Sequence, residues 1–428
     1  MIIWLYSLFY FFLFLLLQTL RPFLSGKIRT LVEEKNLGRF RNPGGQHELN
    51  PIWIHAASGE IEYAKPFIRA LKKQYPHLPL LVTFSSPSAI SLIEKIEEVD
   101  FWGPCPWDLP WEIDTFIKRW NPRAVFFART DVWPMLSLRL RQHKIPSYLI
   151  SATFSENSSR LKTPIHFITF ATLAKLTQIF CVSSEDQNNL KKHGYQTDNL
   201  SVLGDTRYEQ VLYRLNHPKK LKPEIKPQPQ KTIIFGSTWP EDEAFLLKSL
   251  PTLKNNNLQI IWAPHEPTPS HLHELTEQIR ASQGHLNVAF YSQALDSNWD
   301  ILLVDQVGIL AELYTWGSCA FVGGSFKAQV HSVMEALAAG LPVAVGPFYK
   351  NNREALDFKQ VEIAAQLMAV SVVHESHDFE QWTNRVLVLS KHERENLQHL
   401  IEERAHTTSA LLSQLPHKLF APSAITKN

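Results

Sequence analysis

The sequence predicts an α/β protein in which two doubly wound domains follow an N-terminal membrane helix. Three observations predict this fold. Short apolar runs alternate with amphipathic helical patterns from about residue 50 onward. A polar segment rich in proline and lysine interrupts the alternation at residues 216–231. An uncharged, strongly apolar run occupies Ile2–Leu20 at the start of the chain.

The uncharged run predicts a transmembrane anchor at residues 1–22. As a helix it would measure about 28 Å, close to the thickness of a bilayer core. A signal peptide would carry basic residues before its apolar run. Here they follow it, so the rest of the chain is expected in the cytoplasm. These charges either only set the orientation or also contact anionic lipid headgroups. They are Arg21, Lys27, Arg29, Lys35, Arg39 and Arg41.

The first domain is predicted at residues 23–215. Its apolar runs are short, rich in β-branched and aromatic residues, and bounded by turn residues, as in buried strands. Helical patterns such as Glu60–Tyr75 and Trp133–His143 lie between them. This alternation indicates a parallel sheet that is covered on both faces, as in a Rossmann-like domain. The predicted strands are "PIWIHAA", "LPLLVTFSS", "RAVFFA", "PSYLISA", "QIFCVSS" and "LSVLGD".

A second Rossmann-like domain is predicted at residues 231–420, after a linker at 216–230. It ends in a long helical stretch that begins near "DFEQWTNRV". Its predicted strands are "TIIFGST", "LQIIWAPH", "NVAFYS", "WDILLVD", "SCAFVGGS", "LPVAVGP" and "AVSVV".

Composition excludes several classes of protein. The 428 residues suit two domains, and the net charge of +2 does not favour a nucleic-acid binder. The cysteines are Cys105, Cys181 and Cys319, and no two form a CxxC pair, so neither a disulfide framework nor a zinc site is expected. No paired aspartates are placed as a metal-binding loop, and we expect neither a metal nor a cofactor.

The first candidate for chemistry is Glu60 in "IWIHAASGEIEYA". It lies where a predicted strand turns into a helix, and ligands of open α/β sheets bind outside the carboxyl ends of the strands. Two explanations stay open. The carboxylate either favours the positive end of the helix dipole or faces a cleft and takes part in catalysis.

The second candidate lies in "CAFVGGSFKAQVHSVMEALAAGLPVAVGP". A strand ends at Gly323-Gly324, and a helix is predicted from about His331 to Ala339. Glycines and a helix N-terminus favour an anion. His331 and Glu335 would share a helix face, where Glu335 is either a surface residue or an acceptor for a ribose diol.

These segments resemble the family of the 3-deoxy-D-manno-octulosonic acid (Kdo) transferases. Members have the two-domain GT-B fold, in which two Rossmann-like domains face a cleft. They transfer Kdo from CMP-Kdo to a lipid A precursor in Gram-negative bacteria. The resemblance covers most of the chain and includes the N-terminal anchor. It is carried by "IWIHAASGEIEYAKPF", "ARTDVWPM", "LGDTRYEQV", "GSTWPEDE", "APHEP", "DQVGILAELY" and the segment around Gly323.

The resemblance implies roles for individual residues. Glu60 matches the catalytic base, Asp131 matches a catalytic acidic residue that is usually Glu, and Arg207 matches a basic residue at the end of the first domain. The chain departs from the family in a turn before Glu60 that is one residue shorter, and in Gln329-Val330 before the histidine. The residues implied on the CMP-Kdo side are Arg207, Ser237, Thr238, His265, Gly323, Gly324, Ser325, His331, Glu335 and Asn351.

The implied function is that of an inverting glycosyltransferase at the bacterial inner membrane. It would take CMP-Kdo and the lipid A precursor lipid IVA, with one N-terminal span and cytoplasmic catalytic domains, in lipopolysaccharide biosynthesis. The Gly323-Gly324 loop, the helix start at His331 and Arg207 would meet the donor phosphate. Two alternatives stay open, which are another GT-B enzyme such as a nucleotide-sugar epimerase, and a non-catalytic, membrane-anchored binder of sugar nucleotides.

Overall fold

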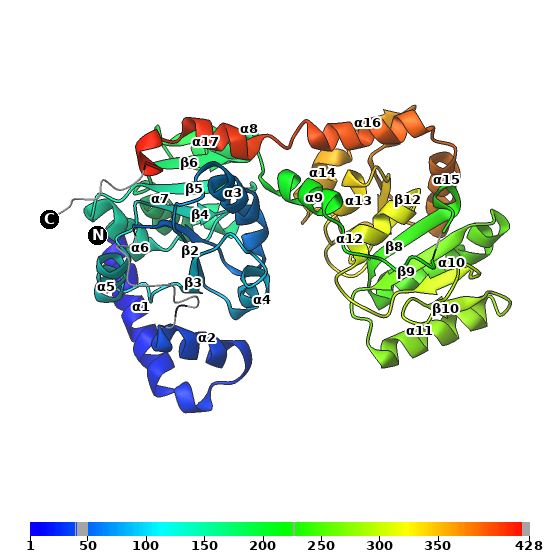
Figure 1. The fold of residues 1–428 in the computed structure, drawn as a ribbon, viewed down its shortest axis with the longest axis horizontal. Helices are drawn as coiled ribbons and strands as arrows, with labels where there is room; N and C mark the ends of the chain where they lie inside the picture. Colours follow the sequence, from blue (N-terminus) through cyan, green and yellow to red (C-terminus); the bar gives the residue numbers. More distant parts are fainter. Residues whose placement is uncertain (39, 41–49, 226, 422–428) are drawn as a thin grey trace. The chain divides into compact units, whose positions relative to one another are not determined.

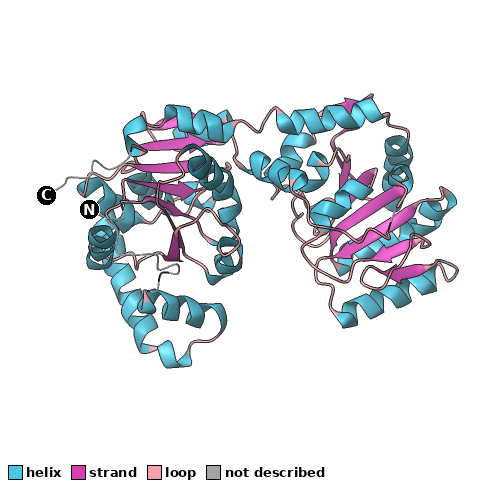
Figure 2. Cartoon of the chain, viewed as in Figure 1, coloured by secondary structure: helices cyan, strands magenta, loops and turns pink. Residues whose placement is uncertain are grey.

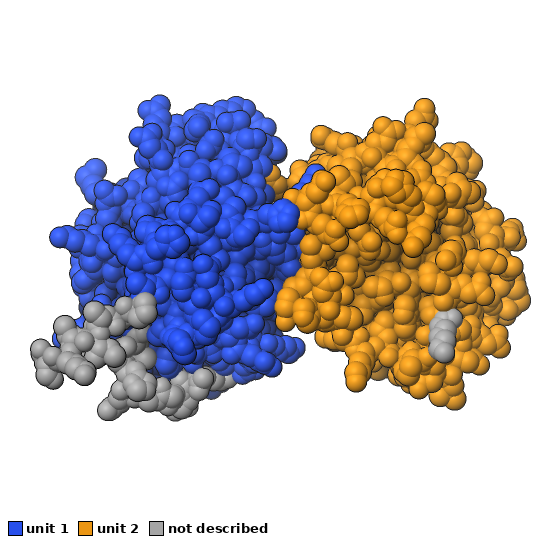
Figure 3. Space-filling view, turned by 45° about the horizontal axis from the view of Figure 1, so that its top comes forward, with its two compact units in different colours: residues 1–210, 404–428 blue, residues 211–403 orange. Residues whose placement is uncertain are grey.

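The computed structural model describes residues 1–38, 40, 50–225 and 227–421, which form two compact units (Figure 3). The first unit comprises Met1–Gln210 and Arg404–Asn428, and the second comprises Val211–Glu403. Each contains a parallel sheet of seven strands with helices on both faces (Figure 2). Two doubly wound domains are therefore confirmed, whereas the cleft between them stays a prediction.

The first sheet has the strand order β3-β2-β1-β4-β5-β6-β7 (Figure 1). All its pairs are parallel, and His55 at the end of β1 lies level with Thr83 of β2 and Phe127 of β4. Each predicted strand of this domain is present, and the edge strand β3 was not predicted. The strands are β1 Ile52–His55, β2 Leu80–Phe84, β3 Phe101–Pro104, β4 Ala124–Ala128, β5 Ser147–Ala152, β6 Gln178–Cys181 and β7 Leu200–Val202.

The helices of the first unit cover both faces of this sheet. On one face, Phe67 and Leu71 of α3 are fully buried against β1 and β4. The helices are α1 Ile2–Thr19, α2 Gly26–Leu37, α3 Ile61–Gln74, α4 Ile90–Ile93, α5 Pro110–Trp120, α6 Pro134–Gln142, α7 Ile165–Leu173, α8 Ser184–Lys192, α9 Arg207–Asn216 and α17 Thr407–Gln414. Short 3₁₀-helices are η1 Arg21–Phe23, η2 Ser58–Glu60, η3 Pro87–Ala89, η4 Ser159–Leu161 and η7 His417–Leu419.

Helix α1 is long and apolar enough to cross a membrane, and it also packs on the first unit. One face is buried, with Ile3 and Tyr10 only 4% and 8% exposed. The opposite face is open, with Phe9 70% and Phe12 60% exposed. The helix therefore contacts the rest of the first unit along one face and leaves an apolar face exposed.

Not all the basic residues after α1 are placed for lipid contact. The ammonium of Lys35 donates to the carbonyl oxygen of Pro106 at 3.3 Å and lies 4.8 Å from the centre of the Trp107 ring. This cation faces protein, so Lys35 does not support the alternative of a headgroup contact, which stays open for the other basic residues. Arg29 remains exposed and pairs with Glu33 at 2.8 Å. Arg39 and Arg41 lie outside the described residues.

The second sheet has the strand order β10-β11-β9-β8-β12-β13-β16. Every predicted strand is present, and the antiparallel pair β14 and β15 was not predicted. The strands are β8 Thr232–Thr238, β9 Gln259–Pro264, β10 Val288–Phe290, β11 Ile301–Leu303, β12 Cys319–Val322, β13 Val343–Val345, β14 Glu362–Ala364, β15 Leu367–Met368 and β16 Val370–Val372.

The helices of the second unit include α15 Ser376–Leu387 and α16 Lys391–Glu402, the first part of the predicted helical stretch, whereas its last part, α17, belongs to the first unit. The other helices of the second unit are α10 Pro240–Asn255, α11 Pro269–Ser282, α12 Leu310–Leu313, α13 Met334–Ala338 and α14 Arg353–Phe358, with 3₁₀-helices η5 Pro229–Lys231 and η6 Tyr314–Trp316.

The ranges of the two units differ from the predicted domains in two respects. The first unit ends within α9, because the following segment, predicted as a linker, binds the second unit. Its Lys222 N–H donates to the Tyr291 hydroxyl at 3.1 Å. The chain also returns to the first unit at Arg404. There the Thr408 N–H donates to the Glu209 carboxylate at 2.7 Å, and Leu411 is fully buried.

Candidate active site

Glu60 and Asp131 meet at the carboxyl edge of the first sheet. From β1 the chain builds β2 and β3 on one side, and then returns to build β4 to β7 on the other. This reversal between β1 and β4 is the place where doubly wound folds bind ligands. Glu60 ends η2, directly after β1, and Asp131 follows β4. The structure therefore brings together the two residues predicted to be catalytic.

The carboxylate of Glu60 is largely buried and weakly bound. Its Oε1 accepts only a long hydrogen bond of 3.4 Å from the Thr130 hydroxyl. Its Oε2 is buried and has no hydrogen-bond partner within the described part of the chain. Burial, and next the charge of Asp131, raise the pKa of Glu60 to about 7. A carboxylate with a free oxygen and this pKa suits a general base near neutral pH.

Asp131 is held by a buried histidine. His55 is fully buried, and its Nε2 lies 3.0 Å from Asp131 Oδ2 while its Nδ1 lies 2.9 Å from the Thr83 hydroxyl. Ser85 donates to the same Asp131 oxygen at 2.6 Å. Burial opposes ionisation of Asp131, but the hydrogen bond and charge of His55 outweigh it and lower the pKa to about 2. Asp131 is therefore a fixed anion beside Glu60.

Three arginines lie around this edge of the first unit. The positive charges of Arg129 and Arg160 act on Glu60 and partly offset the rise of its pKa. The guanidinium groups of Arg129 and Arg207 lie 5.0 and 5.7 Å from the centre of the Tyr63 ring. Arg207, predicted on the donor side, thus belongs to the unit that carries Glu60. The positive charges favour an anionic substrate.

Several residues at the carboxyl ends of strands have positive φ angles. They include Ser58 after β1 and Arg129 after β4, with φ of 32° and 64°. L-residues avoid this region, and such strain gathers at functional sites. Ser58 lies in the shortened turn before Glu60, and its hydroxyl lies 2.7 Å from the Ser88 hydroxyl. This contact holds the turn that positions Glu60.

In the second unit, the strand order reverses between β8 and β12. The loops that follow these strands approach very closely. A Cβ atom on Gly323 would lie 2.4 Å from the carbonyl oxygen of Ser237, so no larger residue fits there. The predicted donor residues Ser237, Thr238, Gly323 and Gly324 therefore gather at this second switch point.

The Gly-Gly loop does not offer its N–H groups to a phosphate in this structure. Gly324 and Phe326 both donate to the carboxylate of Asp242, at 2.6 and 2.9 Å. The Gly323 N–H donates to the carbonyl oxygen of Gly236 at 2.9 Å. The expectation that this loop presents free donors is wrong, because Asp242 of α10 occupies the N–H groups of Gly324 and Phe326, and β8 occupies that of Gly323.

The predicted helix start at His331 is also wrong. Helix α13 begins at Met334, and the His331 N–H donates to the carbonyl oxygen of Gly323 at 3.0 Å. His331 instead belongs to an aromatic stack with Trp239 and His265. The ring centre of His265 lies 4.2 Å from that of His331 and 4.7 Å from that of Trp239.

This stack contains a neutral histidine. The Trp239 indole N–H donates to His331 Nε2 at 2.9 Å, which places the imidazole proton on Nδ1. Burial, followed by the neighbouring His265 and Lys327, lowers the pKa of His331 to about 4. Lys327 places its ammonium 3.3 Å from the centre of the Trp239 ring. The stack thus combines three flat rings with one positive charge.

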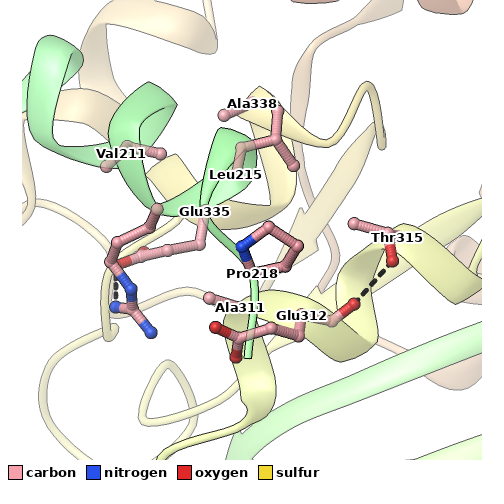
Figure 4. A pocket seen from close by; sticks show the side chains of 9 residues that line it. Val211, Leu215, Pro218, Ala311, Glu312, Thr315, Glu335 and Ala338 are labelled. Carbon is pink, nitrogen blue, oxygen red and sulfur yellow. Dashed lines mark hydrogen bonds and ion pairs between the residues drawn. The ribbon is translucent and has the colours of Figure 1, made fainter. Parts of the chain in front are cut away.

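Glu335 lies in a small pocket of the second unit, together with Glu312 and Arg214 (Figure 4). Its carboxylate pairs with Arg214 at 3.7 Å and is 19% exposed. Glu312 is 5% exposed, and its Oε2 has no hydrogen-bond partner among residues the structure describes. Helix α13 begins only at Met334, so His331 lies outside the helix. His331 and Glu335 therefore do not share a helix face, contrary to the prediction.

Three other predicted donor residues are occupied by internal hydrogen bonds. The Thr238 hydroxyl donates to Glu243 at 2.9 Å, and the Ser325 hydroxyl donates to the carbonyl oxygen of Val322 at 3.1 Å. Both side chains are fully buried. The Asn351 amide bonds both backbone groups of Val330 at 3.1 Å. Their hydrogen bonds hold the backbone and side chains around the switch point, and they are not free for a ligand in this structure.

The prediction from sequence missed His55 and Trp239. Their positions in the sequence could have indicated both. His55 ends an apolar strand, and Trp239 directly follows one. Both lie at carboxyl ends of strands next to a switch point, where ligands of such folds bind.

The sequence is similar to known proteins of one family. Residues 32–210 match the family model described as 3-deoxy-D-manno-octulosonic-acid transferase (kdotransferase). The enzyme so named from Haemophilus influenzae is 26% identical over 362 residues, which cover 81% of this chain and 81% of that protein. The one from Bordetella pertussis is 26% identical over 359 residues, covering 74% of this chain and 80% of the relative.

Solved structures similar to the chain include UDP-N-acetylglucosamine 2-epimerases. One has a TM-score of 0.59 at 13% identity and covers 86% of this chain and 96% of its own. Another, from Neisseria meningitidis and bound to UDP-GlcNAc, has a TM-score of 0.59 at 15% identity, with coverages of 85% and 98%. At such identities the likeness shows the two-domain fold alone.

Proposed function

The chain belongs to the Kdo transferase family of glycosyltransferases, and from this premise we propose that it transfers Kdo from CMP-Kdo to a lipid A precursor. The observation that carries the proposal is the carboxylate of Glu60. It lies at the switch point of the first sheet with an unpartnered oxygen and a pKa of about 7. An alcohol is a poor nucleophile at neutral pH and needs such a base.

In the proposed reaction, Glu60 takes the proton of an acceptor hydroxyl. The hydroxyl oxygen forms a bond to the anomeric carbon of Kdo while the bond from that carbon to the CMP phosphate breaks. The configuration inverts, and CMP leaves as an anion. Asp131, fixed by His55, orients the acceptor through hydrogen bonds from its other hydroxyls.

The donor is proposed to bind the second unit. Trp239, His265 and His331 provide flat faces, and Lys327 provides a positive charge for the phosphate. Glu335 is proposed to accept hydrogen bonds from the ribose. Since the N–H groups of Gly324 and Phe326 are occupied by Asp242, the phosphate depends on cations, to which Arg207 of the first unit would also contribute.

Transfer itself tests this function. CMP release and product mass are measured with CMP-Kdo and lipid IVA. An epimerase would instead convert a sugar nucleotide without an acceptor, and a non-catalytic binder would bind CMP without releasing it from CMP-Kdo. Product containing Kdo supports the proposal, and either alternative result contradicts it.

The membrane location yields a first prediction. We propose that α1 anchors the chain in the inner membrane, with both units in the cytoplasm. Because its outer face exposes apolar side chains such as Phe9 and Phe12, the full-length chain is expected in the membrane pellet. High salt should not release it, whereas detergent should. Recovery in the soluble fraction would contradict the anchor.

A second prediction concerns Glu335. Glu335→Ala should weaken CMP binding by about 1–3 kcal/mol, or roughly 5- to 150-fold, because a charged acceptor for the ribose is lost. Calorimetric titration of CMP measures this change. Glu395→Ala on α16, which removes an exposed Glu that pairs with Lys391 at 3.4 Å, is the matched control. Equal affinities for the wild type and Glu335→Ala would exclude the ribose contact.

A further inference from the structure

A pocket of the first unit opens beside Asp131. It has a volume of about 290 Å³, close to the lower limit of small-molecule sites. Thr130, Asp131 and Arg160 form its polar side. Its other walls are mostly apolar and include Ile168 and Leu173 of α7. Thr169 and Thr172 also line it, and their hydroxyls donate to backbone carbonyls of the same helix. A ligand that fits must be polar at one end and apolar at the other.

Helix α1 supplies part of the apolar wall through Tyr6. Tyr6 is held from both sides, because Ile3 and Tyr10, each about one helical turn away, are buried against the first unit. The Tyr10 ring meets the Trp133 ring edge to face, with the centres 6.0 Å apart. The apolar helix that is expected in the bilayer is therefore also a structural part of this pocket.

The apolar surface continues from the pocket to the outside. Ile165 lines the pocket and is 49% exposed, and Phe167 on the same helix is 53% exposed. The outer face of α1 exposes Phe9 and Phe12 as well. The pocket therefore has an exposed apolar rim at Ile165.

The polar end of the pocket is close to the proposed base. The hydroxyl of Thr130, which lines the pocket, donates to Oε1 of Glu60 at 3.4 Å. A sugar whose hydroxyl reaches Glu60 would therefore place its neighbouring substituents at the pocket. In a glycolipid those substituents are acyl chains, and Arg160 offers a positive charge to a phosphate.

We propose that this pocket binds an acyl chain of the acceptor glycolipid and that Tyr6 of α1 forms one of its walls. The inference rests on the proposed function and adds a role for the anchor. Helix α1 then recognises the acceptor, and does not only keep the protein at the membrane.

The test compares two acceptors that share one sugar headgroup. One is acylated and dispersed in detergent, and the other is fully deacylated and soluble. Tyr6→Ala and Ile168→Ala should raise KM about tenfold for the acylated acceptor and leave KM for the deacylated one unchanged. Tyr6→Phe keeps the ring but loses the hydrogen bond of its hydroxyl to Asp108, so its melting temperature should fall while KM for both acceptors stays at the wild-type value. Phe9→Ala alters the outer face of α1 and should match the wild type, because detergent removes the need for anchoring.

Two results would overturn the pocket. An equal rise of KM for both acceptors would make Tyr6 a support for Asp131 and not a contact of the chain. Unchanged KM values in Tyr6→Ala and Ile168→Ala, both folded by melting temperature, would place the acyl chain elsewhere.

Failure of the proposed function gives a different result. In that case the wild type transfers Kdo to neither acceptor. A phosphoglycolipid with a photoreactive diazirine on its acyl chain then decides about the pocket. Cross-links to Tyr6 or to α7 support it, and cross-links only to other segments overturn it.

Discussion

Replacing Glu60 by glutamine is expected to reduce Kdo transfer roughly 100- to 10,000-fold, the usual contribution of a general base. Glutamine keeps the size and shape of the side chain but does not accept a proton at neutral pH. CMP affinity should be unchanged, because the proposed donor residues Trp239, His265 and His331 belong to the second unit. Transfer and calorimetric CMP binding, measured on both proteins, test this expectation.

The pH dependence adds a second readout. Since the pKa of Glu60 is about 7, wild-type kcat/KM should fall about tenfold for each pH unit below that value. The residual activity of Glu60→Gln should lack this acid limb. An unchanged limb in the variant would assign the titration to another group.

The change in the free energy of unfolding caused by Glu60→Gln distinguishes the catalytic explanation from the helix-dipole explanation, because the two predict opposite signs. A carboxyl group whose pKa is raised in the folded state destabilises the fold once pH exceeds its unfolded pKa, and fully so above about 7. Glu60→Gln should therefore be more stable than the wild type at pH 8, by about 1–3 kcal/mol. If Glu60 only favoured the dipole of α3, the variant would instead lose about 0.3–1 kcal/mol.

A matched control lies two residues further along the chain, in the first turn of α3. Glu62→Gln makes the same change in α3, where the carboxylate pairs with Lys65 at 2.5 Å. This control should keep transfer within a few-fold of the wild type. Transfer by Glu60→Gln at the level of Glu62→Gln would contradict the catalytic role.

Most strands were predictable because they are buried on both faces and appear as continuous apolar runs. The edge strand β3 was missed because its sequence Phe101–Pro104 contains glycine and proline, which are rare in strands. Helix α13 was predicted too long because the apolar pattern continues back to Val330. In the structure, Asn351 bonds the backbone of Val330, and the Asn352 side chain bonds that of His331.

The candidate site was predictable only in part. Residues that directly follow strands, such as Glu60 and Asp131, could be placed at one sheet edge because the alternation implies parallel strands. Contacts between residues far apart in sequence could not be predicted. Asp242 occupies the N–H of Gly324, and His55 holds Asp131, through pairings that no local pattern encodes.

Replacing Asp131 by asparagine is expected to have the second large effect, on both stability and transfer. His55 is fully buried, and burial opposes its charged form, but Cys105 and Asp131 outweigh burial and raise its pKa. Asparagine removes the charge that pairs with His55. Loss of one partner of a buried pair costs about 3–5 kcal/mol.

The shifted pKa values of Asp131 and His55 determine the pH at which Asp131→Asn loses most stability. The lowered pKa of Asp131 stabilises the fold above about pH 4, and this stability is lost as pH falls toward 2. The raised pKa of His55 stabilises the fold fully below about pH 6.5, and less as pH rises through the folded pKa. The difference between the wild type and Asp131→Asn should therefore be largest near pH 5 and smaller at pH 9, as measured by chemical denaturation.

Transfer should respond to Asp131→Asn in two ways. Without the neighbouring anion the pKa of Glu60 falls, so the acid limb of kcat/KM should move to lower pH. At pH 8 the rate should fall roughly 10- to 150-fold, since a charged hydrogen bond to the acceptor is worth about 1.5–3 kcal/mol. Asp131→Glu restores the charge and should recover most of the transfer. If Asp131→Asn instead kept the wild-type acid limb and its stability near pH 5, His55 and Asp131 would not be an ion pair, and Glu60 would owe its raised pKa to burial alone.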